Sequence, residues 1–370
     1  MGKLTPVAVA TIAIVGAVVT ACGNGDKRDG ASTLAVPGVT VGPAVCGGED
    51  TLSAEGSTAQ EAAMGLFNQA WSRLCPGKKV LYKPTGSGIG RKRFIAGHID
   101  FAGSDSPLVS EQIGPAAERC GGNPAWDVPL VFGPIALVYN LTDVPAVTLD
   151  ADSMAKIFTG LIRAWDDPIL AALNPDLDLP KTPITPIYRS DLSGTTDNFQ
   201  KYLTAAAPQS WDKGVGGEFH GGVGKGAHGS AGVIAAVKAN PGAIGYVEKG
   251  FADQAGVPYV QLETGNGVVP LTQETATNAV DAVTFAARGN DLVLDLTSVY
   301  GLQGPEAYTL VLATYEIVCS GGYDPDTGAA VKGFLATAAT EGQADLSKAG
   351  YVPLPKKVRE RVATAINAMQ

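Results

Sequence analysis

Two long apolar runs constrain the fold more than any other feature of this sequence. Residues 129–140 read PLVFGPIALVYN and residues 309–318 read TLVLATYEIV, with about 170 residues between the two runs. Such runs are typical of strands that are buried on both faces. If both strands cross between two lobes, the end of the chain returns to the first lobe. We therefore expect lobe I to comprise residues 46–134 and 306–370, and an inserted lobe II to comprise residues 135–305.

Short strands and helices alternate before the first apolar run. The predicted elements are a strand at 51–54, a helix at 58–73, a strand at 80–82 and a helix at 90–96. The longer helix carries an apolar stripe that includes Leu66, Phe67 and Trp71, which suits a helix packed on a sheet. This alternation indicates an α/β fold.

The amino terminus indicates an exported protein. The largely apolar run from Val7 to Val19 is shorter than the roughly 20 residues of a membrane span, but it suits the core of a signal peptide. The run closes with VTAC at residues 19–22, which is typical of a bacterial lipobox. We expect residues 1–21 to be a lipoprotein signal peptide and Cys22 to carry the lipid. The alternative is an ordinary secretory signal in which the cysteine occurs by chance.

A polar tether is predicted between the lipid and the globular part. The predicted tether covers residues 22–45, of which residues 23–42 are a mixture of Gly, Ser, Thr, Asp and Pro with little to bury. About 20 residues of flexible coil reach roughly 25 Å, enough to hold a domain off the bilayer. The predicted location is therefore the outer face of the cell membrane, with the lipid as the membrane contact.

The charge balance excludes a nucleic-acid-binding protein. The chain has 370 residues, a net charge of -9, and no basic stretch denser than Arg91-Lys92-Arg93. An anionic ligand would have to be held by local geometry against this overall field.

The remaining cysteines predict two disulfides. Cys46, Cys75, Cys120 and Cys319 are an even number in an exported chain. Cys46 precedes the first strand and Cys75 ends the first helix, so both fall at one edge of a parallel sheet. This favours Cys46 with Cys75, and hence Cys120 with Cys319. The three scattered histidines show no metal-ligand spacing, and we expect neither a metal nor a cofactor.

Four segments place Gly, Ser or Thr where a strand gives way to a helix. They are GSTA at 56–59, GSG at 86–88, GSDS at 103–106 and RSDLSGTT at 189–196. Helix starts present free N–H groups and a positive dipole end, and hydroxyls add donors, so together these segments predict an anion site. Any one of them alone is more often only a helix cap.

Two of these segments carry ionisable groups. Arg189 offers a planar fork of donors that the Asp191 carboxylate could orient, although a solvated ion pair would contribute little. Asp105 places a carboxylate in a segment suited to anions, where it would repel a fully deprotonated ligand. A ligand that carries a proton could instead donate a hydrogen bond to it. The alternative role for Asp105 is that of a helix cap.

Other catalytic motifs do not match. The segment FHGGVGKG at 219–226 lacks the first glycine and the final hydroxyl of a phosphate-binding P-loop. A hydrolase nucleophile lies in a Gly-x-Ser-x-Gly motif, and no serine of the four segments has a glycine two positions before it. Asp166 and Asp167 precede Pro168, which indicates a turn.

The chain resembles the phosphate-binding lipoproteins of bacterial Pst ABC transporters. The resemblance rests on GSTA at 56, GSG at 86, DFAGSDSPL at 100, KIFTG at 156, RSDLSGTTDNFQ at 189 and PGAIGYVE at 241. It implies a two-lobed periplasmic-binding-protein fold of type II, in which mixed sheets are flanked by helices and two strands form the hinge. It also implies ligand contacts from Thr58, Ala59, Ser87, Asp105, Arg189, Ser193, Gly194 and Thr195, with Asp191 supporting Arg189. Ala59 departs from an aromatic residue that is common in relatives.

The predicted function is capture of inorganic phosphate outside the membrane and delivery to a permease driven by a cytoplasmic ATPase. The protein is expected to act as a monomer and to be a receptor, not an enzyme. A receptor for another tetrahedral oxyanion, such as sulfate or a phosphonate, is one alternative. An exported phosphatase is another, but it would need a nucleophile and a metal or histidine acid at the site.

Overall fold

The computed structural model describes residues 1–2, 34–36, 39–41, 46–144 and 146–370. Nearly all of the predicted signal peptide, Cys22 and most of the predicted tether lie outside these residues, so these features stay predictions. Two short strands fall within the tether segment, β1 (Leu34–Val36) and β2 (Val39–Val41), and they pair antiparallel. In the described part of the chain, every helix is too short or too polar to cross a membrane.

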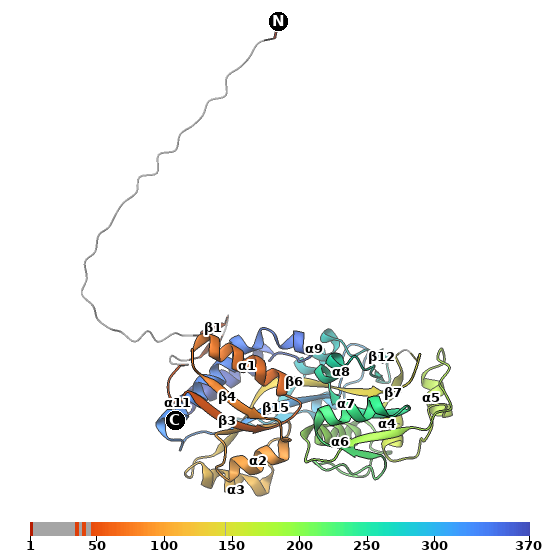
Figure 1. Cartoon of the computed structure of the whole chain (residues 1–370), viewed down its shortest axis with the longest axis horizontal. Coiled ribbons are helices and arrows are strands. Elements are labelled where there is room, and N and C mark those ends of the chain that lie inside the picture. Colours follow the sequence, from red (N-terminus) through yellow and green to blue (C-terminus); the bar gives the residue numbers. More distant parts are fainter. Residues whose placement is uncertain (3–33, 37–38, 42–45, 145) are drawn as a thin grey trace, which may run out of the picture. The chain divides into compact units, whose positions relative to one another are not determined.

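One mixed sheet of eight strands organises the molecule, in the order β4-β3-β5-β15-β6-β10-β8-β9 (Figure 1). The strands are β3 (Thr51–Gly56), β4 (Lys79–Lys83), β5 (Phe101–Ser104), β6 (Ala125–Tyr139), β8 (Thr185–Arg189), β9 (Lys225–Ala227), β10 (Ala243–Glu248) and β15 (Val311–Cys319). The two apolar runs of the sequence lie mostly in β6 and β15, at the centre of this sheet. From β6 residue 127 onward, and along all of β15, every residue is buried.

Strand β6 changes partner part-way along its length. Residues Ala125–Pro134 pair antiparallel with β15, and Ile135–Tyr139 pair antiparallel with β10. The change falls between Pro134 and Ile135, and the missing N–H of Pro134 leaves one fewer ladder hydrogen bond there. The first half of the molecule comprises β4, β3, β5 and β15 with their helices, and the second half comprises β10, β8 and β9 with theirs. β6 therefore belongs to both halves.

Helices cover both halves of the sheet (Figure 1). Those of the first half are α1 (Glu61–Leu74), α2 (Ser87–Ile95), α3 (Ser110–Arg119), α11 (Pro325–Ala339) and α12 (Lys356–Ala368). Those of the second half are α4 (Ala151–Phe158), α5 (Pro168–Leu173), α6 (Gly194–Ala206), α7 (Gly229–Ala239) and α8 (Lys249–Ala255). Trp71 of α1 and Phe334 of α11 meet edge to face at 5.6 Å, so the end of the chain packs against its beginning.

The remaining elements are small. A separate three-stranded sheet has the order β12-β11-β7, with β7 (Thr148–Asp150), β11 (Gln261–Glu263) and β12 (Val268–Val269). Strands β13 (Thr284–Phe285) and β14 (Leu294–Asp295) form a hairpin between α9 (Gln273–Asp281) and α10 (Thr297–Tyr300). Two short 3-10 helices, Glu341–Gln343 and Leu346–Ala349, separate α11 from α12.

Two predicted helix starts differ from the observed ones. α1 begins at Glu61, three residues after the predicted start, because residues 58–60 form a turn after β3. α2 begins at Ser87, three residues before the predicted start, because Gly86 makes the turn with a φ of 97°. The predicted first residue, Gly90, lies inside α2, where a Cβ would be 2.7 Å from the Glu55 carbonyl of β3. As a result, the Thr58 hydroxyl lies in the turn after β3, and the Ser87 hydroxyl lies at the first residue of α2.

The predicted disulfide pairing is confirmed. Cys46 bonds to Cys75 and Cys120 bonds to Cys319, with Cα atoms 5.2 and 5.3 Å apart. The second bond joins residues 199 positions apart in the sequence and ties the end of α3 to the end of β15. A cross-link that closes so long a loop restricts the unfolded chain strongly.

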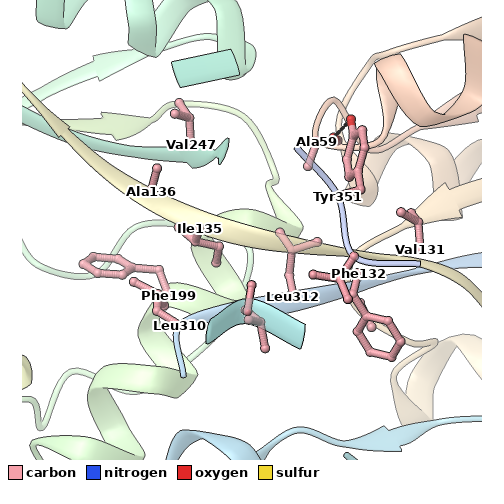
Figure 2. Close-up of a cluster of buried hydrophobic side chains, with 14 of the residues drawn as sticks. Ala59, Val131, Phe132, Ile135, Ala136, Phe199, Val247, Leu310, Leu312 and Tyr351 are labelled. Atoms are coloured by element: carbon pink, nitrogen blue, oxygen red, sulfur yellow. Dashed lines mark hydrogen bonds between the residues drawn. The ribbon is translucent and has the colours of Figure 1, made fainter. Parts of the chain in front are cut away.

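The larger of two hydrophobic clusters among the described residues runs along β6 and β15 from one half into the other (Figure 2). In Figure 2, Val131 and Phe132 lie on the first-half side of β6, and Ala136 lies on its second-half side. The Tyr351 hydroxyl donates to the Ala59 carbonyl at 2.7 Å, which ties the segment after β3 to residues near the chain end. The two halves therefore share apolar packing as well as a strand.

Candidate anion-binding site

The structure brings all four Gly/Ser/Thr segments together. They follow β3, β4, β5 and β8, and the carboxyl ends of such strands in an open α/β sheet are the usual place for ligands. The Gly88 N–H donates to the Leu192 carbonyl at 2.9 Å, which joins the first half to the second. The four segments therefore lie together, as one anion site would require, and their binding of a ligand stays a prediction.

The first segment forms a turn ahead of α1. The Thr58 and Ser230 hydroxyls are 2.8 Å apart and share a hydrogen bond between the two halves. The Ala59 N–H, predicted as a ligand contact, donates to the Ser57 hydroxyl at 3.0 Å. The predicted pair therefore has different roles here, because Thr58 faces the other half and Ala59 closes its own turn.

Asp105 is held by hydroxyl groups. Its Oδ1 accepts from Thr314 at 2.8 Å, its Oδ2 accepts from Ser87 at 3.3 Å, and its N–H donates to Ser87 at 3.1 Å. Only 3% of Asp105 is exposed. Burial raises the pKa of Asp105, while hydrogen bonds from Ser57 and Thr314 and the charge of Arg189 oppose the rise. The next helix, α3, has Val109 at its N-cap, so the alternative role of Asp105 as a helix cap is wrong.

Arg189 and Asp191 form a buried pair at the end of β8. Arg189 Nε donates to Asp191 Oδ1 at 2.7 Å, and Nη2 donates to Oδ2. The side chains are 2% and 6% exposed, so the alternative of a solvated surface pair is wrong. Burial raises the pKa of Asp191, but the hydrogen bonds and charge of Arg189 and the Gly229 N–H outweigh it and hold that pKa below its usual value. Arg189 Nη1 points to the Ser230 hydroxyl at 3.4 Å, so the guanidinium is fixed toward the other polar groups.

The start of α6 approaches the first half very closely. Ser193 is the N-cap residue and accepts the Thr196 N–H at 3.2 Å. A Cβ at Gly194 would lie 2.6 Å from Asp105 Cβ and 2.7 Å from Ser87 Oγ, so only glycine fits there. The Thr195 hydroxyl is buried and has no hydrogen-bond partner among the described residues. A buried hydroxyl without a partner is a ready donor for a ligand.

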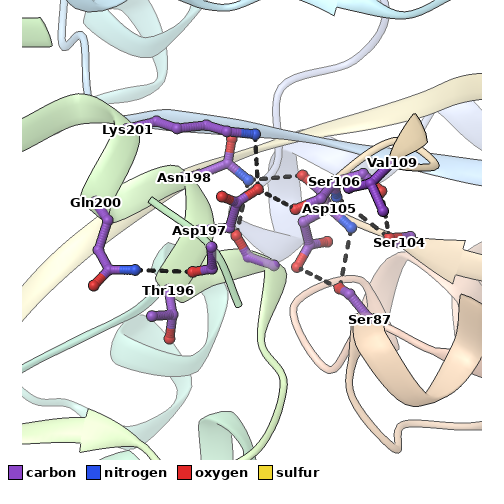
Figure 3. Close-up of polar contacts among 12 residues, drawn as sticks. Ser87, Ser104, Asp105, Ser106, Val109, Thr196, Asp197, Asn198, Gln200 and Lys201 are labelled. Atoms are coloured by element: carbon purple, nitrogen blue, oxygen red, sulfur yellow. Dashed lines mark hydrogen bonds and ion pairs between the residues drawn. The ribbon is translucent and has the colours of Figure 1, made fainter. Parts of the chain in front are cut away.

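Three side chains support the site but were not predicted from the sequence. Asn198 of α6 donates to the Asp105 carbonyl at 2.7 Å and to the Gly194 carbonyl at 2.8 Å (Figure 3). Arg91 donates to the Ser104 hydroxyl at 2.8 Å, although the sequence placed it only in a short basic stretch. Ser230 follows β9 in the segment HGSA at 228–231, which has the same strand-to-helix pattern as the four segments. Ser230 could therefore have been found.

A second contact between the halves flanks Asp105. The Ser106 hydroxyl donates to Asp197, whose carboxylate also accepts from Lys201 at 2.7 Å (Figure 3). Taken together, the site presents one fixed guanidinium, several hydroxyls and one carboxylate that can accept a proton-bearing ligand atom. Among the described residues, no cluster of three or more His, Cys, Asp or Glu could hold a metal ion.

Known proteins with similar sequences bind phosphate according to their names. The family model for the PBP superfamily domain matches residues 42–340. Phosphate-binding protein PstS 3 of Mycobacterium tuberculosis is 44% identical over 364 residues, which cover 98% of each chain. Phosphate-binding protein PstS of Methanocaldococcus jannaschii is 31% identical and covers 85% of each chain.

Solved structures agree with this fold. A high-affinity periplasmic phosphate-binding protein, PfluDING, solved with phosphate, has a TM-score of 0.70 at 22% identity, covering 85% of this chain and 93% of that one. A putative phosphate ABC transporter substrate-binding protein from Clostridium perfringens, solved with phosphate, has a TM-score of 0.59 at 19% identity, covering 82% and 100%. The chain belongs to the PBP superfamily and, within it, to the PstS phosphate-binding proteins.

Proposed function

We propose that this protein is the phosphate receptor of a Pst ABC transporter. The observation that carries the proposal is the buried Arg189, held by Asp191 and aimed at hydroxyls that come from both halves. A rigid, buried guanidinium with surrounding hydroxyls suits a small tetrahedral oxyanion. The family membership gives the ligand its identity as inorganic phosphate.

The proposed ligand contacts come from both halves. They are Thr58, Ala59, Ser87 and Asp105 from the first half, and Arg189, Ser193, Gly194 and Thr195 from the second. Ser230 joins the second set because its hydroxyl already bonds to Thr58 and lies next to Arg189. The unpartnered Thr195 hydroxyl supports this set most directly.

Lobe closure is the proposed mechanism. Lobe I, residues 46–134 and 306–370, and lobe II, residues 135–305, would approach each other by bending at β6 and β15. Phosphate would contact one lobe first, and the donors of the other lobe would engage only in the closed form. The ligand then stabilises closure through these additional contacts.

The partners and location follow from the family. Receptors of this kind work outside the cytoplasmic membrane and pass the ligand to permease subunits powered by an ATPase. We propose that a lipid on Cys22 holds the protein at the outer face of the membrane and that it acts as a monomer.

The Cys22→Ser change tests the anchor. Without the thiol no lipid can be attached, so the protein should leave the membrane fraction and should bind phosphate as before. Fractionation of cells followed by phosphate titration of the released protein measures both. Continued membrane association would point to an uncleaved segment at Val7–Val19.

Titration of ligand-stripped protein with phosphate and then with sulfate tests the receptor function. Tight phosphate binding with no sulfate binding supports the proposal, and equal binding of both would favour a general oxyanion receptor. A phosphatase assay with and without divalent metal addresses the enzymatic alternative. Turnover of a phosphate ester there would contradict the role as a receptor.

A further inference from the structure

The buried acid Glu316 lies close to the proposed phosphate site but is not one of its proposed ligand contacts. It sits on β15 directly opposite Gly103 of β5, and Thr314, two residues earlier on β15, donates to Asp105. Residues directly opposite each other on neighbouring strands point their side chains to the same face, and diagonal neighbours lie about 7 to 8 Å apart. Glu316 and Asp105 are therefore near neighbours on one face of the sheet.

Gln60 fills the space across from Glu316. A Cβ at Gly103 would lie 1.8 Å from Gln60 Nε2 and 2.6 Å from the Tyr82 hydroxyl, so these groups occupy the position of the missing side chain. Gln60 Nε2 donates to the Tyr82 hydroxyl at 3.1 Å, and that hydroxyl donates to the Ser57 carbonyl at 2.7 Å. Ser57 immediately precedes Thr58, so this chain of bonds supports the first ligand-binding turn.

The hydrogen bonding around Glu316 is incomplete. Glu316 is fully buried, and neither of its carboxyl oxygens has a hydrogen-bond partner among the described residues. Gln60 Oε1 is buried and unpartnered in the same way. A proton on the carboxyl would supply the missing donor, whereas a buried carboxylate without a partner is very unfavourable.

None of the described groups that face Glu316 carries a positive charge. They are Gln60 from the turn before α1, Tyr82 from β4 and Asp105 from the end of β5, and each is neutral or negative. Burial, with a smaller contribution from the charge of Asp105, raises the pKa of Glu316 to about 8, and the neighbouring Gln60 side chain opposes the rise. The carboxyl is therefore neutral at and below neutral pH.

We propose that Glu316 is a protonated positioning residue that holds the Gln60–Tyr82–Ser57 chain in place and keeps negative charge away from the phosphate. This inference rests on the proposed function. Ionisation of Glu316 would bring a second negative charge close to Asp105 and to the bound anion. Phosphate binding is then coupled to retention of one proton, and affinity falls once the pH exceeds the pKa of the free protein.

The test is phosphate titration of ligand-stripped protein from about pH 7 to about pH 10. Above about pH 8 inorganic phosphate is nearly all dianion, so its own charge stays constant. A single coupled proton can weaken binding by at most about tenfold per pH unit, and we expect at least tenfold weaker binding at about pH 10 than at about pH 8. Glu316→Gln keeps the shape and removes the proton, so its affinity should match the wild type at neutral pH and should stay nearly constant across this range.

Asp127→Asn is the matched control. Asp127 is another buried carboxyl whose pKa is raised to about 8, mainly by burial, but it accepts from the Leu108 N–H. It pairs with Ile317, so its side chain lies on the opposite face of the sheet from Glu316. This variant should keep the wild-type slope. Equal slopes for the wild type and Glu316→Gln would overturn the assignment, as would a flat profile for the wild type. Absence of phosphate binding at neutral pH would instead contradict the proposed function itself.

A second measurement needs only the wild-type protein. Calorimetric titration at about pH 9 in two buffers with different ionisation enthalpies reports the protons taken up with the ligand. Uptake of up to one proton per phosphate supports the role of Glu316, and uptake of none contradicts it.

Discussion

The two walls of the site differ in charge. The first-half wall, comprising Thr58, Ser87 and Asp105, places a carboxylate among hydroxyl groups. The second-half wall, comprising Arg189, Thr195 and Ser230, places a guanidinium beside hydroxyl groups. Burial raises the pKa of Asp105 on the first wall, whereas the pKa of Asp191 behind the second wall is held low by Arg189. The first wall therefore offers a carboxylate that can accept a hydrogen bond from a ligand, whereas the charged group of the second wall can only donate.

This difference suits an anion that still carries a proton. Phosphate near neutral pH has both deprotonated oxygens for the second-half wall and a hydroxyl for Asp105. Sulfate has no hydroxyl to offer, so it would bring a negative oxygen against a buried carboxylate. We therefore expect the second-half wall to bind the charge of the ligand and the first-half wall to set selectivity.

The largest expected effect comes from Asp105→Asn. Two like charges at hydrogen-bond distance repel by about 4 kcal/mol or more even at an effective dielectric near 20, which corresponds to roughly three decades of affinity. The amide removes this repulsion and can donate, so the variant should admit sulfate and keep substantial phosphate binding. Competition of unlabelled sulfate against labelled phosphate measures the change.

The exposed carboxylate Asp281 provides the control. Asp281→Asn should leave sulfate excluded, as in the wild type. Identical sulfate curves for the wild type and Asp105→Asn would show that the first-half wall does not set selectivity.

A somewhat smaller effect is expected from Arg189→Ala. The change removes one or two charge-assisted hydrogen bonds, and phosphate binding should weaken by about 2 to 4 kcal/mol. The exposed Arg163, whose side chain donates to the Gly160 carbonyl in its own turn, serves as the control, and Arg163→Ala should bind normally. Calorimetric titration of both variants with phosphate measures the change. An unchanged curve for Arg189→Ala would show that the guanidinium does not contact phosphate.

The smallest effect is expected from Ser230→Ala. Its hydroxyl shares a neutral hydrogen bond with Thr58 and accepts only a long one, 3.4 Å, from Arg189 Nη1, so we expect a loss of about 1 kcal/mol. The same titration should show phosphate affinity weaker by about fivefold. Ser210→Ala is the comparison, because that hydroxyl bonds to Asp152 away from the site. A change equal to that of Arg189→Ala would mean that Ser230 orients the guanidinium.

The sequence predicted those parts of the site that local chemistry determines. Arg189, Asp191 and the glycines at helix starts follow from the pattern of strand, small residues and helix, and the cysteine pairing follows from their places at strand and helix ends. Ser230 lies in a segment with the same pattern but was not predicted as a site residue. Thr314 and Glu316 could not be predicted, because they sit in an apolar run and acquire their roles only when β15 lies beside β5.

The helix starts show a second limit of prediction from the sequence. Periodicity placed the first residue of α1 at Thr58, but this residue lies in a turn and faces Ser230 of the other half. The cap and the first turn depend on contacts from distant segments, and the apolar stripe reports only the middle of a helix. Arg91 likewise gained its place beside Ser104 from the packing of α2, which a short basic stretch does not reveal.

The place of β15 in the sheet has a consequence for synthesis and export. β5 and β6 follow each other in the sequence, yet β15 lies between them and pairs with both. The first half therefore cannot complete its sheet until residues 311–319 have emerged, after the whole inserted half has been made. Until then β5 and β6 have exposed edges, which are prone to wrong pairing. A nascent chain stalled before residue 311 should be sensitive to protease throughout residues 46–134, even though these residues were made before the inserted half.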